Sequence, residues 1–159
     1  MESLARHLLE VLDKVLPALK AIPEETASLR AAEGKWSRKE ILGHLIDSAG
    51  NNQQKFVRGI LADPHVDMPA YAQNGWVEVQ QYQTEPWAQL IAFWEAYNRH
   101  LAHVIRRVPA EALDHTVSIS GSQPFTLRFI MEDYVEHLKH HLKQILPDAG
   151  LESAFVNLY

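Results

Sequence analysis

Apolar residues recur at steps of three and four in four long stretches of the chain, which is the period of a helix that buries one face. The stretches run from Leu4 to Leu19, from Ser37 to Asp63-Pro64, from about Thr84 to Pro109, and from about Thr126 to Pro147. Pro17 lies inside the first stretch, so we expect a kink or break there, because proline cannot donate the helical hydrogen bond. The four stretches predict an all-α protein with the architecture of a four-helix bundle.

The segments between these stretches lack the helical period. Residues 64–84 are predicted to form a long loop, and loops of this length in compact domains are usually functional or disordered. The aromatic residues Tyr71 and Trp76 argue against disorder. Residues 115–125 allow a short extended piece or a loop. No segment predicts a convincing sheet, and we expect residues 1–159 to form a single domain.

Composition and charge narrow the possible functions. The 159 residues carry a formal net charge of −5, which offers no electrostatic footprint for nucleic acid or for a membrane surface. The apolar runs are too short for a transmembrane span, and the first residues do not resemble a signal peptide, so we expect a cytoplasmic protein. The chain has no cysteine, which excludes disulfides, thiolate nucleophiles and sulfur-ligated metals, but it has nine histidines.

Two of the nine histidines form a pair on the last predicted helix. His137 and His141 are four residues apart, so they lie on the same face, about 40° apart around the axis, beside the core-facing Tyr134. Two imidazoles with this spacing can share one metal ion, although a third ligand has to come from another helix. His140 lies about 100° from His141 and is predicted to face solvent.

The second predicted helix offers the candidate partner. His44 lies at the border of its apolar face and begins a polar stripe that could line a cleft, formed with Ser48, Asn51 and Lys55. Asp47 is one turn from His44 and is a candidate catalytic residue, either as a general base or as a hydrogen-bond acceptor behind the metal site. Asp133, four residues before His137, is a second candidate acceptor for an imidazole N–H.

Other interpretations of these residues stay open on the pattern alone. A single histidine at a helix border is usually a hydrogen-bonded structural side chain, and the six other histidines show no convergent spacing. Tyr71 and Trp76 could pack the loop on the bundle or face a ligand. Phosphate-binding glycine loops, nucleophile elbows and the paired Glu-x-x-His motifs of di-iron bundles are absent from the sequence.

Three segments, taken together, resemble the DinB-like/YfiT-like superfamily of metal-dependent enzymes. They are KWSRKEILGHLIDS at residues 35–48, YAQNGW at residues 71–76 and YVEHLKHHLKQI at residues 134–145. The resemblance implies a four-helix bundle of up-down-down-up topology, often a homodimer, with one divalent metal ion, most often zinc or nickel. Carried over residue by residue, the metal ligands are His44, His137 and His141.

The resemblance also implies an activity on small molecules. Some members are thiol-dependent S-transferases or isomerases that use bacillithiol, mycothiol or glutathione, and others are hydrolases, so a low-molecular-weight thiol is an expected partner. Ala72 stands where many relatives carry an acidic residue, which weakens any mechanism that needs a carboxylate there. The alternative is a non-catalytic, stress-associated bundle that binds a metal or forms dimers. The sequence leaves open whether residues 151–159 pack on their own bundle or on a neighbour.

Overall fold

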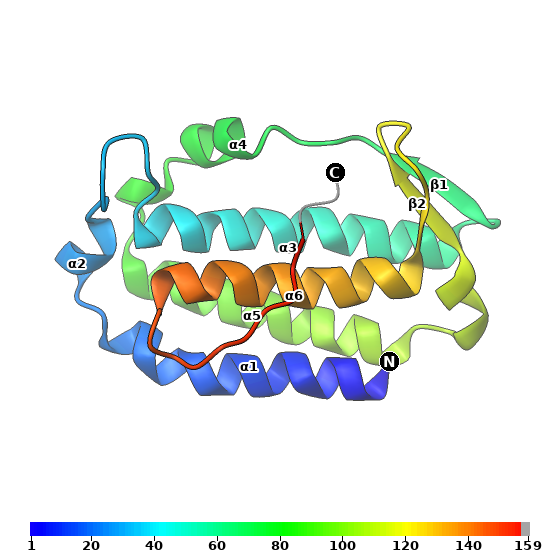
Figure 1. Cartoon of the computed structure of the whole chain (residues 1–159), viewed down its shortest axis with the longest axis horizontal. Helices are drawn as coiled ribbons and strands as arrows, with labels where there is room; N and C mark the ends of the chain where they lie inside the picture. The colour runs from blue at the N-terminus through cyan, green and yellow to red at the C-terminus, as the bar shows by residue number, and fades with distance from the viewer. Residues whose placement is uncertain (157–159) are drawn as a thin grey trace.

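The computed structural model describes residues 1–156 and contains four long helices that lie side by side along the long axis of the molecule (Figure 1). They are α1 (Glu2–Ala21), α3 (Arg38–Leu61), α5 (Trp87–Arg107) and α6 (Leu127–Ile145). Helices α1 and α6 run in one direction and α3 and α5 in the other, which gives the predicted up-down-down-up topology. Within the described residues, no helix is long and apolar enough to cross a membrane.

Apolar stripes hold the four helices together. Helix α1 packs mainly on α5, and α3 packs on both α5 and α6. The largest fully buried side chains, Trp94, Tyr134 and Phe56, come from three different helices, and the rings of Phe56 and Tyr134 meet edge to face. The buried Tyr134 hydroxyl donates a hydrogen bond to Asn98, so the one polar group of this ring is satisfied inside the core.

Helix α1 continues through Pro17 to Ala21, so the chain does not break at this residue, and the other expectation, a kink, stays a prediction. Leu16 and Leu19, which flank the proline, are both buried against the bundle. Burial of such side chains contributes about 1.5–3 kcal/mol each, which is enough to offset a missing helical hydrogen bond near the end of a helix.

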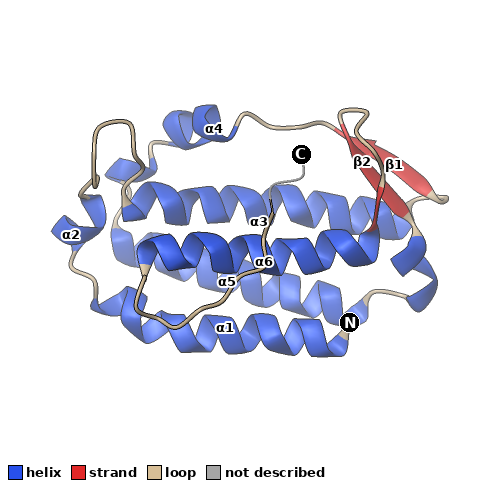
Figure 2. Ribbon diagram, viewed as in Figure 1, coloured by secondary structure: helices blue, strands red, loops and turns tan. Residues whose placement is uncertain are grey.

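The predicted loop over residues 64–84 is also wrong in part, because it contains three short elements. They are strand β1 (His65–Met68), helix α4 (Gln73–Gln80) and the 3-10 helix η1 (Tyr82–Thr84). Strand β2 (Thr116–Ile119) pairs in parallel with β1 and antiparallel with β3 (Phe125–Thr126). This small sheet, which the sequence did not predict, lies at the end of the bundle where α3 ends and α6 begins (Figure 2).

Two short elements complete the chain: α2 (Glu24–Ser28), at the opposite end of the bundle, and the 3-10 helix η2 (Ala110–Asp114) before β2. Residues 149–156 turn back and run across α6 toward α3 (Figure 1). Ser153 donates to the backbone carbonyl of Glu136, and the amide of Ala154 donates to the Glu136 carboxylate. The described part of the C-terminal segment therefore packs on its own bundle, whereas residues 157–159 lie outside the described residues.

Candidate metal centre

Helix α3 begins at a capping box that fixes the start of the site. The Ser37 hydroxyl accepts from the amide of Glu40, and the Glu40 carboxylate accepts from the amide of Ser37 at 2.8 Å, as the sequence predicts. His44 follows within two turns and is fully buried, with the ring of Trp36 5.1 Å away between ring centroids. The first turns of α3 therefore lie inside the molecule and carry polar side chains there.

Helix α6 brings the histidine pair to the same place. It runs antiparallel to α3, so the beginning of α3 lies beside the end of α6, where His137 and His141 stand one turn apart. One nitrogen from each of His44, His137 and His141 lies within 4.8 Å of the other two. The Nε2 atoms of His44 and His137 are 3.3 Å apart. We call these three residues the histidine cluster.

Burial keeps the histidine cluster uncharged. Desolvation, reinforced by the other histidines, lowers the pKa of His44 to about 3 and that of His137 to about 2. Desolvation also lowers the pKa of His141, which the hydrogen bond that His141 Nδ1 donates to the Gln144 side-chain oxygen partly opposes. Neutral imidazoles keep a lone pair on one ring nitrogen, and this is the form of histidine that binds metal ions.

Neighbouring side chains orient two of the three rings. The Ser48 hydroxyl lies 3.3 Å from Nδ1 of His137, and the Gln144 side-chain oxygen lies 3.1 Å from Nδ1 of His141. Such contacts hold a ring in place and leave its other nitrogen for a ligand. Nδ1 of His44 is buried and has no hydrogen-bond partner within residues 1–156. Nε2 of His44 lies on the opposite side of the ring and faces Nε2 of His137, so a shared cation between them would give both Nε2 atoms a partner but would leave Nδ1 of His44 unpaired.

A cavity of about 350 Å³ opens beside the histidine cluster, and we call it the inner cavity. Helix α3 contributes Ser48, Asn52 and Lys55 to its wall, and the segment before α4 contributes Tyr71. Of the predicted polar stripe of α3, Ser48 and Lys55 line this cavity, whereas Asn52 takes the place of Asn51 and His44 lies in the histidine cluster behind the wall. Tyr71 faces this cavity and also packs on Trp76 at 5.1 Å between ring centroids, so it has both of the roles left open by the sequence.

The C-terminal segment covers one side of the inner cavity. Phe155 lines it, with ring centroids 5.0 Å from His137 and 5.4 Å from His140. His140 is half-buried, accepts a hydrogen bond from the Gln144 side-chain amide at 3.2 Å and lines the cavity, so it faces solvent only in part. The reason is that residues 149–156 cover a face of α6 that a helical wheel counts as exposed.

Asp47 lies on the side of α3 that faces α4 and η1. Its Oδ1 accepts hydrogen bonds from the Tyr82 hydroxyl at 2.6 Å and from the Gln80 side chain, while Oδ2 is buried without a partner among the described residues. Burial raises the pKa of the Asp47 carboxyl, which the two hydrogen bonds oppose. Asp47 is not part of the histidine cluster, and its predicted catalytic role stays a prediction.

The remaining histidines lie elsewhere. His65 contacts Thr116 in the small sheet, His115 contacts the backbone of Gly59, and His100 stacks with His103 on α5. The sequence reasoning missed Trp36, Gln144 and Phe155 as neighbours of the site. Gln144 is three residues after His141, so its contact was readable from helical spacing, whereas the contacts of Phe155 depend on the path of the C-terminal segment.

The chain was compared with protein families and with curated sequences. A model described as the DinB superfamily matches residues 7–145. The comparison with curated protein sequences finds no match.

Solved structures with the same fold include two from Bacillus subtilis. YfiT, described as a probable metal-dependent hydrolase with an unusual four-helix bundle topology, superposes with a TM-score of 0.81 at 18% identity over 91% of this chain and 83% of YfiT. A DinB-like protein, YjoA, gives a TM-score of 0.66 at 16% identity over 98% of this chain and 99% of YjoA. A mycothiol-dependent maleylpyruvate isomerase gives 0.70 at 15% identity over 96% of this chain but only 60% of the isomerase.

Proposed function

The chain belongs to the DinB superfamily, and from this premise we propose that it is an enzyme that acts on a small molecule with the help of a divalent metal ion. We propose His44, His137 and His141 as the ligands. The observation that carries the proposal is the convergence of three neutral imidazoles, contributed by two antiparallel helices, of which His137 and His141 line a cavity. No packing requirement explains this arrangement, since buried histidines are costly unless they are paired.

The donor set fits a zinc-like or nickel-like ion. Imidazole nitrogen suits zinc, copper, iron and nickel, and catalytic zinc sites often combine three protein ligands with one open position. Two nitrogens that each lie about 2.0–2.1 Å from a tetrahedral zinc ion are about 3.3–3.4 Å apart, close to the 3.3 Å between Nε2 of His44 and Nε2 of His137. When bound, the ion would act as a Lewis acid and lower the pKa of a water molecule or of a thiol.

Two reactions are compatible with this site: hydrolysis by water, and transfer to or from a low-molecular-weight thiol. YfiT is described as a probable hydrolase, and the isomerase is described as mycothiol-dependent, so the related folds support both. The chain has no cysteine, and a thiol taking part in the reaction would therefore arrive with a substrate. A homodimer and a cytoplasmic location remain predictions.

The chain's own side chains have separable tasks in this proposal. Ser48 and Gln144 hold the rings of His137 and His141 in orientation. Phe155 and Tyr71 narrow the inner cavity and exclude water from one side of the histidine cluster. The volume of about 350 Å³ lies at the small end of the range for ligand sites, which favours a compact substrate.

We propose that Asp47 acts as a positioning residue for this site. Its hydrogen bonds to Tyr82 and Gln80 tie α3 to α4 and η1, the elements that follow Tyr71 in the chain. Loss of the carboxylate would loosen this side of the cavity. The predicted role as general base requires, in addition, that the unpaired Oδ2 reach a reactant.

Metal analysis of protein purified without a metal-affinity tag tests the proposal. We expect about one divalent ion per chain, and we expect His137→Ala to lose it. His140→Ala is the matched control, because His140 lies in the same helix and the same cavity wall but outside the histidine cluster. Metal-free wild-type protein that takes up no zinc or nickel on addition would refute the proposal and favour the non-catalytic alternative.

A further inference from the structure

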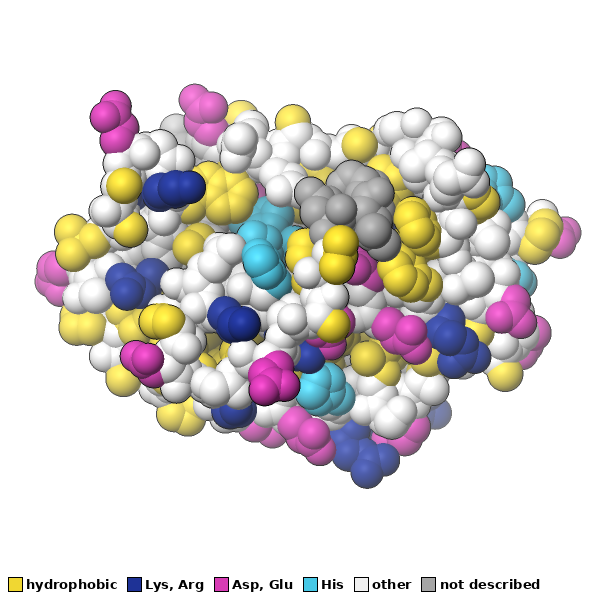
Figure 3. All heavy atoms as spheres, viewed as in Figure 1, with side chains coloured by type: hydrophobic (Ala, Val, Ile, Leu, Met, Phe, Trp, Pro, Cys, Tyr) yellow, Lys and Arg dark blue, Asp and Glu magenta, His cyan; other side chains and the backbone are white. Residues whose placement is uncertain are grey.

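The histidine cluster lies between two cavities. His141 lines the inner cavity on one side and, on the other, a larger cavity of about 800 Å³ that also includes Trp36 and Gln144. In the space-filling view, histidine side chains reach the surface near the middle of the face shown, beside apolar side chains (Figure 3). Of the three histidines, His141 is therefore the one that faces both cavities, whereas His137 faces only the inner cavity.

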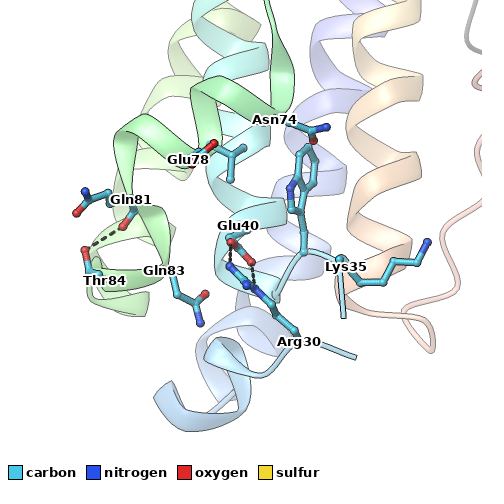
Figure 4. Close-up of a pocket in the computed structure, with 11 residues that line it drawn as sticks. Arg30, Lys35, Glu40, Asn74, Glu78, Gln81, Gln83 and Thr84 are labelled. Carbon is cyan, nitrogen blue, oxygen red and sulfur yellow. Dashed lines mark hydrogen bonds and ion pairs between the residues drawn. The ribbon is translucent and has the colours of Figure 1, made fainter. Parts of the chain in front are cut away.

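The second cavity differs from the first in charge, and we call it the basic cavity. Arg30, Lys35 and Arg38 line it, and within residues 1–156 no aspartate or glutamate does. Arg30 and Lys35 also line the adjoining pocket drawn in Figure 4, whose wall includes Glu40 and Glu78. The inner cavity instead has one lysine and one aspartate, besides its histidines, in its wall. A cavity lined by three cations is unexpected in a chain whose net charge is −5.

Two of the three cations keep their full charge. Arg30 is neutralised by Glu40, which accepts both arms of its guanidinium at 3.0 and 2.5 Å (Figure 4). Arg38 lines the basic cavity and donates to the backbone carbonyls of Ile145 and Thr26 at 3.3 Å, and it has no ion-pair partner within residues 1–156, although Asp148 lines the adjoining cavity that it shares with these two carbonyls. Lys35 is exposed, has no ion-pair partner in the described part of the chain, and extends away from Glu40 and Glu78 in Figure 4.

The basic cavity also has apolar surface next to the histidine cluster. The ring of Trp36 lies 5.1 Å from that of His44, and Leu29 is 66% exposed at the cavity wall. A ligand that fits here would carry anionic groups at one end and present a less polar end toward His141. The volume is sufficient for a molecule of a few hundred daltons.

We propose that the basic cavity binds a second reactant, a small molecule with carboxylate groups that Lys35 and Arg38 hold while its other end reaches the histidine cluster beside His141. This inference rests on the proposed function and deepens it, since the inner cavity then receives the first reactant.

Ligand binding to the basic cavity can be measured without activity. The probes are succinate and succinamide, which match in size and differ in charge, added to zinc-loaded and to metal-stripped protein. The readout is the indole N–H signal of Trp36 in proton–nitrogen NMR spectra, assigned with Trp36→Phe. We expect succinate to shift this signal saturably in both forms of the protein and succinamide to leave it unchanged.

A pair of charge reversals tests the assignment to this cavity. Lys35→Glu is expected to weaken succinate binding about tenfold, because one accessible ion pair is replaced by a repulsion. Lys143→Glu, at an exposed position on α6 that is not among the residues lining the basic cavity, makes the same change in net charge and is expected to leave the affinity within about twofold. Equal weakening by the two variants, or equal shifts with the two probes, would overturn the inference.

The two proposals fail separately in this experiment. Succinate binding that depends on Lys35 in a protein that never takes up metal would support the basic cavity and refute the metal-dependent function. Stoichiometric metal with no succinate-dependent shift of Trp36 would overturn the basic cavity and leave the metal centre standing. A thiol probe with two carboxylates, mercaptosuccinate, should bind the zinc-loaded protein at least tenfold more tightly than succinate if the bound molecule reaches the cluster.

Discussion

Two glycines of α3 are predicted to respond in opposite ways to the same substitution. A Cβ atom added at Gly43 would overlap the ring atoms Cγ, Cδ2 and Cε2 of Tyr82, which packs directly against the helix. A Cβ atom at Gly50 would meet the Tyr97 hydroxyl at 3.5 Å, an ordinary contact distance. The missing side chain at Gly43 therefore leaves room for the Tyr82 ring, which reaches Asp47. No neighbouring side chain occupies the corresponding space at Gly50.

The magnitudes follow from three contributions. Alanine is better than glycine inside a helix by about 1 kcal/mol, and nothing opposes this gain at Gly50. At Gly43 the overlap forces Tyr82 to move, and overpacking of this kind costs about 1–3 kcal/mol. The movement also endangers the 2.6 Å hydrogen bond from Tyr82 to Asp47, which contributes about 1 kcal/mol. We expect Gly50→Ala to stabilise the protein by about 1 kcal/mol and Gly43→Ala to destabilise it by about 1–3 kcal/mol.

Urea unfolding followed by far-ultraviolet circular dichroism measures both effects on the free energy of unfolding. The double variant Gly43→Ala/Tyr82→Ala is the control, since the added methyl group has nothing to overlap once the ring is gone. In the Tyr82→Ala background, Gly43→Ala should be neutral or stabilising. A Gly43→Ala variant as stable as Gly50→Ala would refute the packing of Tyr82 against α3, and with it the proposed positioning role of Asp47.

Three further predictions concern the site. A chelator should lower the melting temperature of the metal-loaded protein, because free metal at about 100 times its Kd stabilises the folded state by about 2.7 kcal/mol. Differential scanning calorimetry measures the shift in melting temperature, and we expect no shift for His137→Ala. Metal-free protein should lose stability in urea titrations as the pH falls from 7 to 5. The reason is that histidines of the unfolded chain take up protons near pH 6.5, whereas burial holds the pKa of His44 in the folded protein at about 3. The free energy of unfolding should fall by at most about 1.4 kcal/mol per pH unit for each such histidine. Asp47→Ala should cost about 2 kcal/mol in the same assay by leaving Tyr82 and Gln80 without an acceptor, whereas Asp47→Asn, which keeps an acceptor oxygen, should cost less than about 1 kcal/mol.

The helices were predictable because their signals are local and redundant. The capping box at Ser37 and Glu40 marks the start of α3 correctly, and the apolar period marks each bundle helix. Pro17 misled the prediction because its cost is local, while the compensating burial of Leu16 and Leu19 comes from packing with other helices. Strand β1 was missed for a similar reason, since its four residues gain their hydrogen bonds from β2, about 50 residues later.

The candidate site was predictable to the extent that it depends on helical spacing. The pair His137 and His141 followed from the wheel, and the structure places both rings beside His44, whose border position the wheel allowed and the family resemblance singled out. His140 is less exposed than the wheel predicts because Phe155, fifteen residues later, lies against its ring. No local pattern predicts which helix face a returning C-terminal segment will cover.

Net charge is a poor guide to what a single cavity attracts. The charge of −5 argues against extended polyanions, which bind through long-range fields over a large surface. A small carboxylate responds instead to the few groups within about one Debye length of 8–10 Å, and in the basic cavity these include Lys35 and Arg38 without an opposing acid in the cavity wall. The three cluster histidines add no charge of their own near neutral pH, so a divalent ion bound there would carry its full charge and reinforce the same preference. A chain with a negative net charge can therefore still select small anions at one place, because Lys35 and Arg38 have no ion-pair partner within residues 1–156 and backbone carbonyls hold Arg38 in position.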